Sequence, residues 1–114
     1  MTKPFAYISA AWPKDDWLRM RKATNYCRIV YDAGYYPICA LLSTDLYTND
    51  AIPEEHRDRK EFAEELLHRS RILVVCGDEV DPVVKNDIAL ARKWKIAATS
   101  LSGIEELNWQ KFCE

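Results

Sequence analysis

The chain has 114 residues, of which 48% are apolar and 30% are charged, and its net charge is −2. A chain of this length fits one domain and can bury a hydrophobic core without disulfides or metal ions. Its apolar content is too high for an intrinsically disordered chain, and no apolar run approaches the ~20 residues that cross a bilayer. We therefore expect residues 1–114 to form a single globular domain that has no membrane partner.

Targeting and metal-binding signals are lacking in the sequence. The start of the chain has no apolar core of about 7–15 residues such as a signal peptide carries, so we expect a cytoplasmic location. The four cysteines stand singly, with no C-x-x-C pair and no histidine at ligand spacing. We therefore predict reduced, mostly buried thiols, no metal and no cofactor. Charges of both signs are mixed without a basic stripe, which argues against a nucleic-acid partner.

The chain begins with a strand and a helix. Residues 5–9 form a short apolar run that predicts a buried strand. Residues 15–33 carry apolar side chains at helical spacing, an aspartate that can cap the start, and Gly34 where a helix ends. Residues 36–42 predict a second strand. Because Pro37 cannot donate a hydrogen bond to the ladder, this strand is expected away from the centre of the sheet.

The middle of the chain is polar. Residues 43–53 have no periodicity, and loops of this length in compact domains are often functional. Asp45 lies in this loop and is therefore predicted to contact a bound ligand. Residues 54–69 predict an exposed helix with a narrow apolar seam formed by Phe62, Ala63, Leu66 and Leu67. Its many charges are interpreted as a solvated face.

Residues 72–76 form the most strand-like segment, because they are continuously apolar and β-branched, and they predict a strand at the centre of the sheet. Residues 82–94 predict a helix with Asp81 as N-cap and Pro82 in the first turn. A strand at residues 96–99 and a helix at residues 104–112 complete the pattern.

Strands that alternate with helices in so short a chain predict a parallel sheet with helices on both faces. The expected fold is α/β: a three-layer, flavodoxin-like or Rossmann-like domain with a mostly parallel sheet of roughly four to five strands. Ligands of such sheets bind beyond the carboxyl ends of the strands. This rule selects residues 9–12, 41–53 and 77–82 as the segments around a ligand site.

Asp87 is the most informative residue. On a helical wheel of ~100° per residue it falls in the middle of the apolar arc of its helix. The residues one turn away on either side are all apolar: Val83, Val84, Leu90 and Ala91. An ionised carboxylate costs several kcal/mol to bury unless it is paired or hydrogen-bonded, so this position indicates a function. The alternative is an internal acid that is satisfied by the amides of another helix, by Tyr7 or by a serine hydroxyl.

Four further candidates belong to the first strand and the turn after it. Tyr7 and Ser9 share one face of the strand, although a tyrosine in a strand is most often a core residue. Ala10 belongs to a turn of small side chains that lets a ligand approach the backbone. Trp12 could stack on a base or pack over a helix end. No glycine-rich phosphate-binding motif accompanies them.

Gly77, Asp78, Glu79 and Asp81 follow the predicted central strand. Acids in such a cluster can bind sugar hydroxyls, or raise the pKa of a nearby carboxylate. For Asp81 the simpler role is that of a helix cap.

Several short motifs follow one another in a characteristic order over about residues 4–99. They are Tyr7-Ile8-Ser9-Ala10, Ala33-Gly34, Tyr36-Pro37-Ile38, Leu66-Leu67, Leu73 through Asp78, Asn86 through Ala91, and Lys95-Ile96. Together they resemble the nucleoside 2-deoxyribosyltransferase-like superfamily, above all its short bacterial and phage members.

This resemblance implies roles for individual residues. In the characterised transferases a glutamate on the helix after the central strand attacks the anomeric carbon of deoxyribose, and this glutamate falls on Asp87. The tyrosine that helps to hold the acid matches Tyr7, and an acid that precedes the nucleophile can be matched to Asp81. The resemblance also implies a homo-oligomer, because a neighbouring subunit completes the site in these transferases.

The expected function is binding of a nucleoside, a nucleotide or a related ribosyl compound, with cleavage or exchange of its N-glycosidic bond. The alternative is a non-catalytic nucleotide-binding or protein-interaction module on the same fold, which agrees with an aspartate in place of the longer glutamate. The predicted catalytic residues are Asp87, Tyr7 and Asp81. The predicted ligand-binding residues are Ser9, Ala10, Trp12, Asp45, Gly77 and Asp78.

Overall fold

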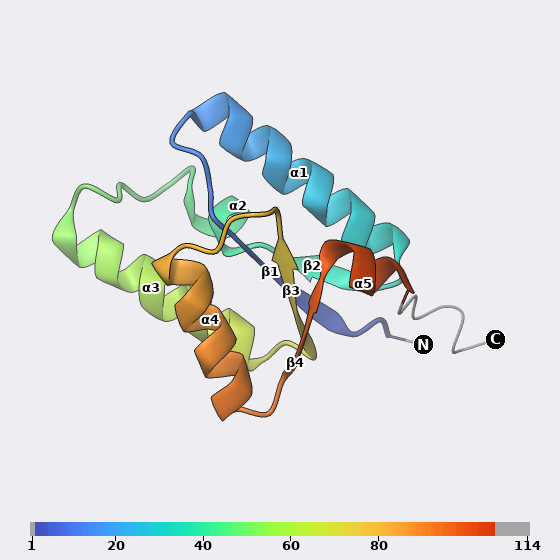
Figure 1. Cartoon of the computed structure of the whole chain (residues 1–114). Helices are drawn as coiled ribbons and strands as arrows, with labels where there is room; N and C mark the ends of the chain where they lie inside the picture. Colours follow the sequence, from blue (N-terminus) through green and yellow to red (C-terminus); the bar gives the residue numbers. More distant parts are fainter. Residues whose placement is uncertain (1, 107–114) are drawn as a thin grey trace.

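The computed structural model describes residues 2–106 and shows a four-stranded parallel sheet with helices on both faces (Figure 1). The strands lie in the order β2-β1-β3-β4. The elements in chain order are β1 (Phe5–Ala10), α1 (Asp16–Asp32), β2 (Tyr36–Ile38), α2 (Ala40–Thr44), α3 (Pro53–His68), β3 (Ile72–Cys76), α4 (Pro82–Lys93), β4 (Ala97–Ser100) and α5 (Leu101–Glu106). The predicted three-layer α/β fold is confirmed.

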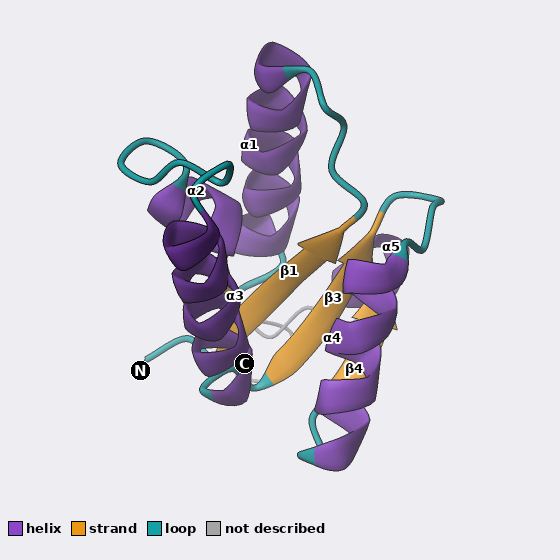
Figure 2. Ribbon diagram, turned by 90° about the vertical axis from the view of Figure 1, so that its left-hand side faces the viewer, coloured by secondary structure: helices purple, strands orange, loops and turns teal. Residues whose placement is uncertain are grey.

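Helices cover both faces of the sheet (Figure 2), and a hydrophobic core lies on each side of it. On one face Ile8 packs with Val30 of α1 and Ile104 of α5. On the other face Tyr7 packs with Leu67 of α3, and α4 covers the same face. Because successive residues of a strand point to opposite faces, β1 contributes side chains to both cores in alternation. The sheet is therefore buried on both sides, which explains the continuous apolar runs of β1 and β3.

The carboxyl ends of β1 and β3 lie side by side, since Ser9 pairs with Val75 and Ala10 with Cys76. The arrowheads of both strands point to the end of the molecule where the next loops leave (Figure 2). The predicted place of β3 in the interior of the sheet and of β2 at its edge are both confirmed.

The second predicted strand is too long. Instead of residues 36–42, β2 ends at Ile38, and a short helix, α2, follows. The hydroxyl groups of Ser43 and Thr44 donate to the carbonyl oxygens of Cys39 and Ala40, one helical turn earlier. A short apolar run such as this one does not by itself distinguish a strand from a buried helix, and here tertiary packing decides.

Most other boundaries agree with the predictions to within one residue. α5 begins at Leu101 instead of at residue 104, and the part of that prediction beyond residue 106 lies outside the described residues. Cys27, Cys39 and Cys76 are free thiols, and the latter two are buried as predicted. Cys113 lies outside the described residues. In residues 2–106 no helix has the length and apolar character that a membrane span needs.

Candidate functional site

Asp87 projects from α4 toward the sheet and is only 7% exposed. The hydroxyl of Ser9, on β1, donates a hydrogen bond of 2.6 Å to Asp87 Oδ2. The predicted inward orientation is confirmed, and the partner is a serine hydroxyl. Of the four apolar residues one turn away from Asp87, Val83 is 63% exposed. It belongs to the first turn of α4, next to the exposed loop before the helix.

Burial raises the pKa of Asp87 to about 6. The hydrogen bond from Ser9 acts in the opposite direction, because it stabilises the ionised form. The negative charges of Glu64 and Asp81 raise the pKa further. A buried acid with these neighbours is ionised near neutral pH, and it can take up a proton just below it.

Tyr7 lies on the same face of β1 as Ser9, which is the side of the sheet that α4 covers. Burial raises the pKa of the Tyr7 hydroxyl far above its usual range, and the charge of Asp87 adds to this effect. The phenol therefore stays protonated. Tyr7, Ser9 and Asp87 thus lie on one side of the sheet. Among the described residues the hydrogen bond to Asp87 comes from Ser9 and none comes from Tyr7, so the holding role that the resemblance implies for Tyr7 belongs to Ser9.

Glu64 is an acid of this cluster that the sequence analysis missed. It was included in the solvated face of its helix, but it is half-buried on α3 and its charge acts on both Tyr7 and Asp87. Asn86 Nδ2 donates to Glu64 Oε1 at 3.4 Å, which links α4 to α3. The position of Glu64 next to Ala63, at the border of the apolar seam, was the one sign of its partial burial in the sequence. Phe62, predicted in that seam, is exposed.

Asp81 has the simpler of its two predicted roles. Its Oδ1 accepts a hydrogen bond of 2.9 Å from the backbone N–H of Val84 and so caps α4. It reaches Asp87 only through its charge.

Four predicted ligand-binding residues gather elsewhere, near Tyr26 of α1. Ala10 is buried in the core under α1, because it points to the face opposite that of Ser9, and it ends β1 instead of forming a turn. The ring of Trp12 packs on that of Tyr26, with centroids 5.9 Å apart. Gly77 has φ +83°, and a Cβ there would lie 3.3 Å from the Tyr26 hydroxyl. Burial raises the pKa of Tyr26, and the electrostatic effects of Cys76 and then Asp78 raise it further.

A polar pocket of about 530 Å³ lies at the carboxyl edge of the sheet. Residues from the loop after β1, from α1, α2 and α3 and from the loop between α2 and α3 line it. They are Trp12, Pro13, Lys14, Asp16, Arg19, Leu41, Asp45, Thr48, Asn49, Asp50 and Arg59. The predicted residues Trp12 and Asp45 are among them, whereas Tyr7, Ser9 and Asp87 are not. The structure thus has two centres, the Asp87 cluster and this pocket.

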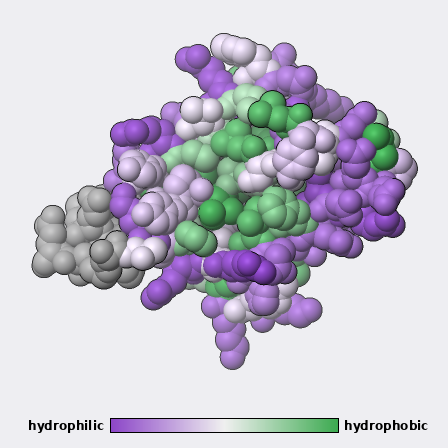
Figure 3. Space-filling model, turned by 180° about the vertical axis from the view of Figure 1, so that it is seen from behind, coloured by the Kyte–Doolittle hydropathy of each residue, from purple (hydrophilic) through white to green (hydrophobic). Residues whose placement is uncertain are grey.

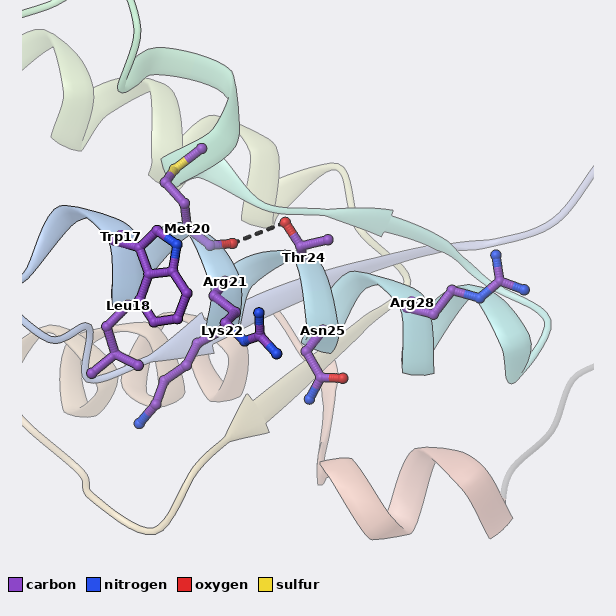
Figure 4. A pocket seen from close by; sticks show the side chains of 8 residues that line it. All are labelled: Trp17, Leu18, Met20, Arg21, Lys22, Thr24, Asn25 and Arg28. Carbon is purple, nitrogen blue, oxygen red and sulfur yellow. Dashed lines mark hydrogen bonds between the residues drawn. The ribbon is translucent and has the colours of Figure 1, made fainter.

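A hollow of about 860 Å³ lies on the outer side of α1 (Figure 4). Its lining comes from one helix and contains the cations Arg21, Lys22 and Arg28 but no acid. Figure 4 shows these side chains spread along the helix, with Trp17 and Leu18 near its start. A ligand there would be contacted from one side only, so we do not include this hollow in the site.

Residues 4–100 match the model of a family described as a domain of unknown function, DUF7768. The chain belongs to the DUF7768 family. The match runs from β1 through β4 and includes every predicted site residue. No curated protein shows significant similarity to the chain.

The chemistry that the DUF7768 domain offers is that of carboxylates and hydroxyls. Within residues 2–106, no group of three or more His, Cys, Asp or Glu side chains could hold a metal ion. The Asp87 cluster provides a buried carboxylate with a protonated phenol and a serine hydroxyl beside it. Such a group can act as a nucleophile or as an acid–base catalyst.

Proposed function

We propose that this DUF7768 domain binds a nucleoside, a nucleotide or a related ribosyl compound, and that it cleaves or exchanges the N-glycosidic bond through Asp87. The observation that carries the proposal is the burial of the Asp87 carboxylate next to the carboxyl end of β1, held by Ser9. Ligands of parallel α/β sheets bind at this edge. The resemblance to the nucleoside 2-deoxyribosyltransferase-like superfamily supports the same residue.

The proposed reaction has two displacements at the anomeric carbon. Asp87 Oδ1 attacks the carbon, the carbon–nitrogen bond breaks, and the base departs with the bonding electrons and takes up a proton from water. Water or a second base, losing a proton, then displaces the carboxylate from the sugar. An anion beneath the sugar stabilises the positive charge of the oxocarbenium-like transition state.

Ser9 and Tyr7 act as positioning residues in this proposal. Ser9 fixes Oδ2 and leaves Oδ1 for the attack. Tyr7 remains neutral, because burial and the charge of Asp87 raise the pKa of its hydroxyl. A neutral neighbour leaves the negative charge of the nucleophile uncompensated, which favours its bonding to an electrophilic carbon.

Binding without cleavage is the second candidate function. Two observations favour it: Asp87 is only 7% exposed, and it does not line the polar pocket. In this case Asp87 is an internal acid satisfied by Ser9, and the pocket alone takes the ligand.

A homo-oligomer is also part of the proposal. Apolar side chains gather near the middle of the face that carries β2 and α2 (Figure 3). The strand β2 is an edge of the sheet, and Tyr36 and Leu46 are exposed. A second copy bound there would cover this apolar surface, and light scattering after size-exclusion chromatography would detect it.

One experiment separates the two functions. The protein is incubated with a panel of ribo- and deoxyribonucleosides and their 5′-monophosphates, and free base is quantified by chromatography while thermal stabilisation is measured in parallel. Base release that depends on Asp87 supports cleavage. Stabilisation by a panel compound without base release supports binding alone, and neither effect with any compound contradicts both functions.

A further inference from the structure

Two arginines line the polar pocket from different helices and keep hydrogen-bond donors unused. Arg19 belongs to α1 and Arg59 to α3, and their side chains are 18% and 19% exposed. Arg19 Nε is buried and has no hydrogen-bond partner, the one such side-chain atom in the part of the chain that the structure describes. An unpaired buried donor costs about 1–3 kcal/mol, so the hydrogen-bonding capacity of Arg19 is not fully satisfied within the described chain.

Asp45 lies between the two guanidinium groups, and its carboxylate oxygens form no direct hydrogen bond to either of them. Its side chain is 17% exposed, and its oxygens lie 3.7 Å from Arg19 Nη2 and 3.8 Å from Arg59 Nη1. Charge-assisted hydrogen bonds between such groups are about 2.7–2.9 Å long. Asp45 is therefore attracted to both arginines without a direct hydrogen bond to either at these atoms.

The frame around these groups is fixed. Arg59 Nη2 donates to the carbonyl oxygen of Thr48 at 2.7 Å, and Arg59 Nε donates to the hydroxyl of the same residue. Arg19 Nη1 donates to the carbonyl oxygens of Pro13 and Lys14, before α1, and Arg19 Nη2 donates to Oδ1 of Asp16. Both guanidinium groups are thus held by the loops that border the pocket, which reduces the entropy that ligand binding would cost.

The charges of the lining residues cancel. Lys14, Arg19 and Arg59 are cationic, and Asp16, Asp45 and Asp50 are acidic. A phosphate placed between the arginines would lie against Asp45 and be repelled by it. A neutral group that offers a hydrogen-bond donor to Asp45 and an acceptor to the arginines meets no such repulsion. It would pair both the carboxylate and the guanidinium groups.

We infer that the polar pocket is a subsite for a neutral, planar heterocycle that presents a lactam edge, an N–H next to a C=O. The N–H donates to Asp45, and the carbonyl oxygen accepts from the guanidinium groups. Trp12, Pro13 and Leu41 supply apolar surface for the flat ring. The inference rests on the proposed function and deepens it: of the nucleobases, those with a lactam edge are the preferred ones.

Hypoxanthine and adenine test this inference, because they share the same ring system and differ in the lactam edge. We expect calorimetry with the full chain to show hypoxanthine binding at least about tenfold more tightly than adenine, a difference of one good hydrogen-bonded contact. Asp45→Asn should reduce this preference severalfold, because the amide can turn its donor toward adenine. Asp32→Asn, an exposed aspartate paired with Arg28, is the matched control and should preserve the preference.

The outcomes separate this inference from the proposed cleavage. Asp87→Asn should leave the hypoxanthine affinity unchanged although it abolishes base release. Equal affinities for the two bases, a preference that Asp45→Asn does not alter, or competition by inorganic phosphate would overturn the subsite, even where base release is observed. A clear preference without base release from any nucleoside or nucleotide would support the subsite and contradict the cleavage.

Discussion

Ser9 Oγ lies 2.6 Å from Asp87 Oδ2, and this hydrogen bond joins β1 to α4 across 78 positions of sequence. It satisfies one oxygen of a carboxylate that α4 holds against the sheet. Burial raises the pKa of Asp87, and Ser9 limits the rise. The balance keeps the acid ionised at neutral pH in an environment that disfavours its charge.

Asp87→Asn should abolish base release and also stabilise the protein at neutral pH. The folded pKa of about 6 lies above the unfolded value of 3.8, so the wild type loses stability as pH rises from about 4 to 6. The full loss, up to about 3 kcal/mol, applies above that range. Urea unfolding should therefore show the variant more stable than the wild type at pH 7, with the advantage declining toward pH 4. An advantage that does not change with pH would contradict the raised pKa.

The rate of base release should rise with pH through about 6, because the nucleophile must be ionised. Glu64→Gln removes a charge that raises the pKa of Asp87, so it should move this rising limb to lower pH. Glu65→Gln is the matched control, since Glu65 is exposed and paired with Arg69. The pH profile of kcat/KM measures both effects. Equal profiles for the two variants would remove Glu64 from the cluster.

Ser9→Ala should raise the pKa of Asp87 further and destabilise the fold by about 1–3 kcal/mol, because the carboxylate loses its donor. Ser70→Ala provides the control: Ser70 is also buried, but it donates to the carbonyl oxygen of Leu66. Carboxyl-carbon NMR titration should show the change of pKa in Ser9→Ala only. An unchanged titration of Asp87 in Ser9→Ala would mean that the hydrogen bond does not hold the acid.

Gly77→Ala should destabilise the protein by about 1 kcal/mol or more. Gly77 has φ +83°, and a Cβ would lie 3.3 Å from the hydroxyl of Tyr26. Tyr26→Phe in the same chain removes the close oxygen but not the backbone strain, so it should restore only part of the loss. Thermal unfolding of the two variants measures this. Full restoration by Tyr26→Phe would assign the cost to contact alone.

Local patterns explain what the sequence predicted well. The helical periodicity of α4 indicated the burial of Asp87, and the aspartate before Pro82 indicated the cap by Asp81. Both features depend on residues within one or two turns of each other. The continuous apolar run Ile72–Cys76 gave β3 with its observed bounds for the same reason.

The parts of the site that depend on tertiary packing could not be predicted. Arg19 and Arg59 meet around Asp45 only because α1 and α3 both border the carboxyl edge of the sheet. Glu64 becomes a neighbour of Asp87 because α3 packs beside α4. The orientation of Ala10, in contrast, follows from the sequence alone. Successive residues of a strand point to opposite faces, so Ala10 points away from the face of Ser9, which argues against a shared ligand contact.

Covalent trapping tests the central claim most directly. A 2′-fluoro nucleoside slows hydrolysis of a glycosyl-enzyme, because the fluorine destabilises the oxocarbenium-like transition state. After incubation, mass spectrometry of the intact protein and its peptides should find one fluorinated sugar on the peptide that contains Asp87, and none in Asp87→Asn. A protein that releases base while Asp87 stays unmodified, or that releases no base from any nucleoside or nucleotide, would contradict the assignment of Asp87 as the nucleophile.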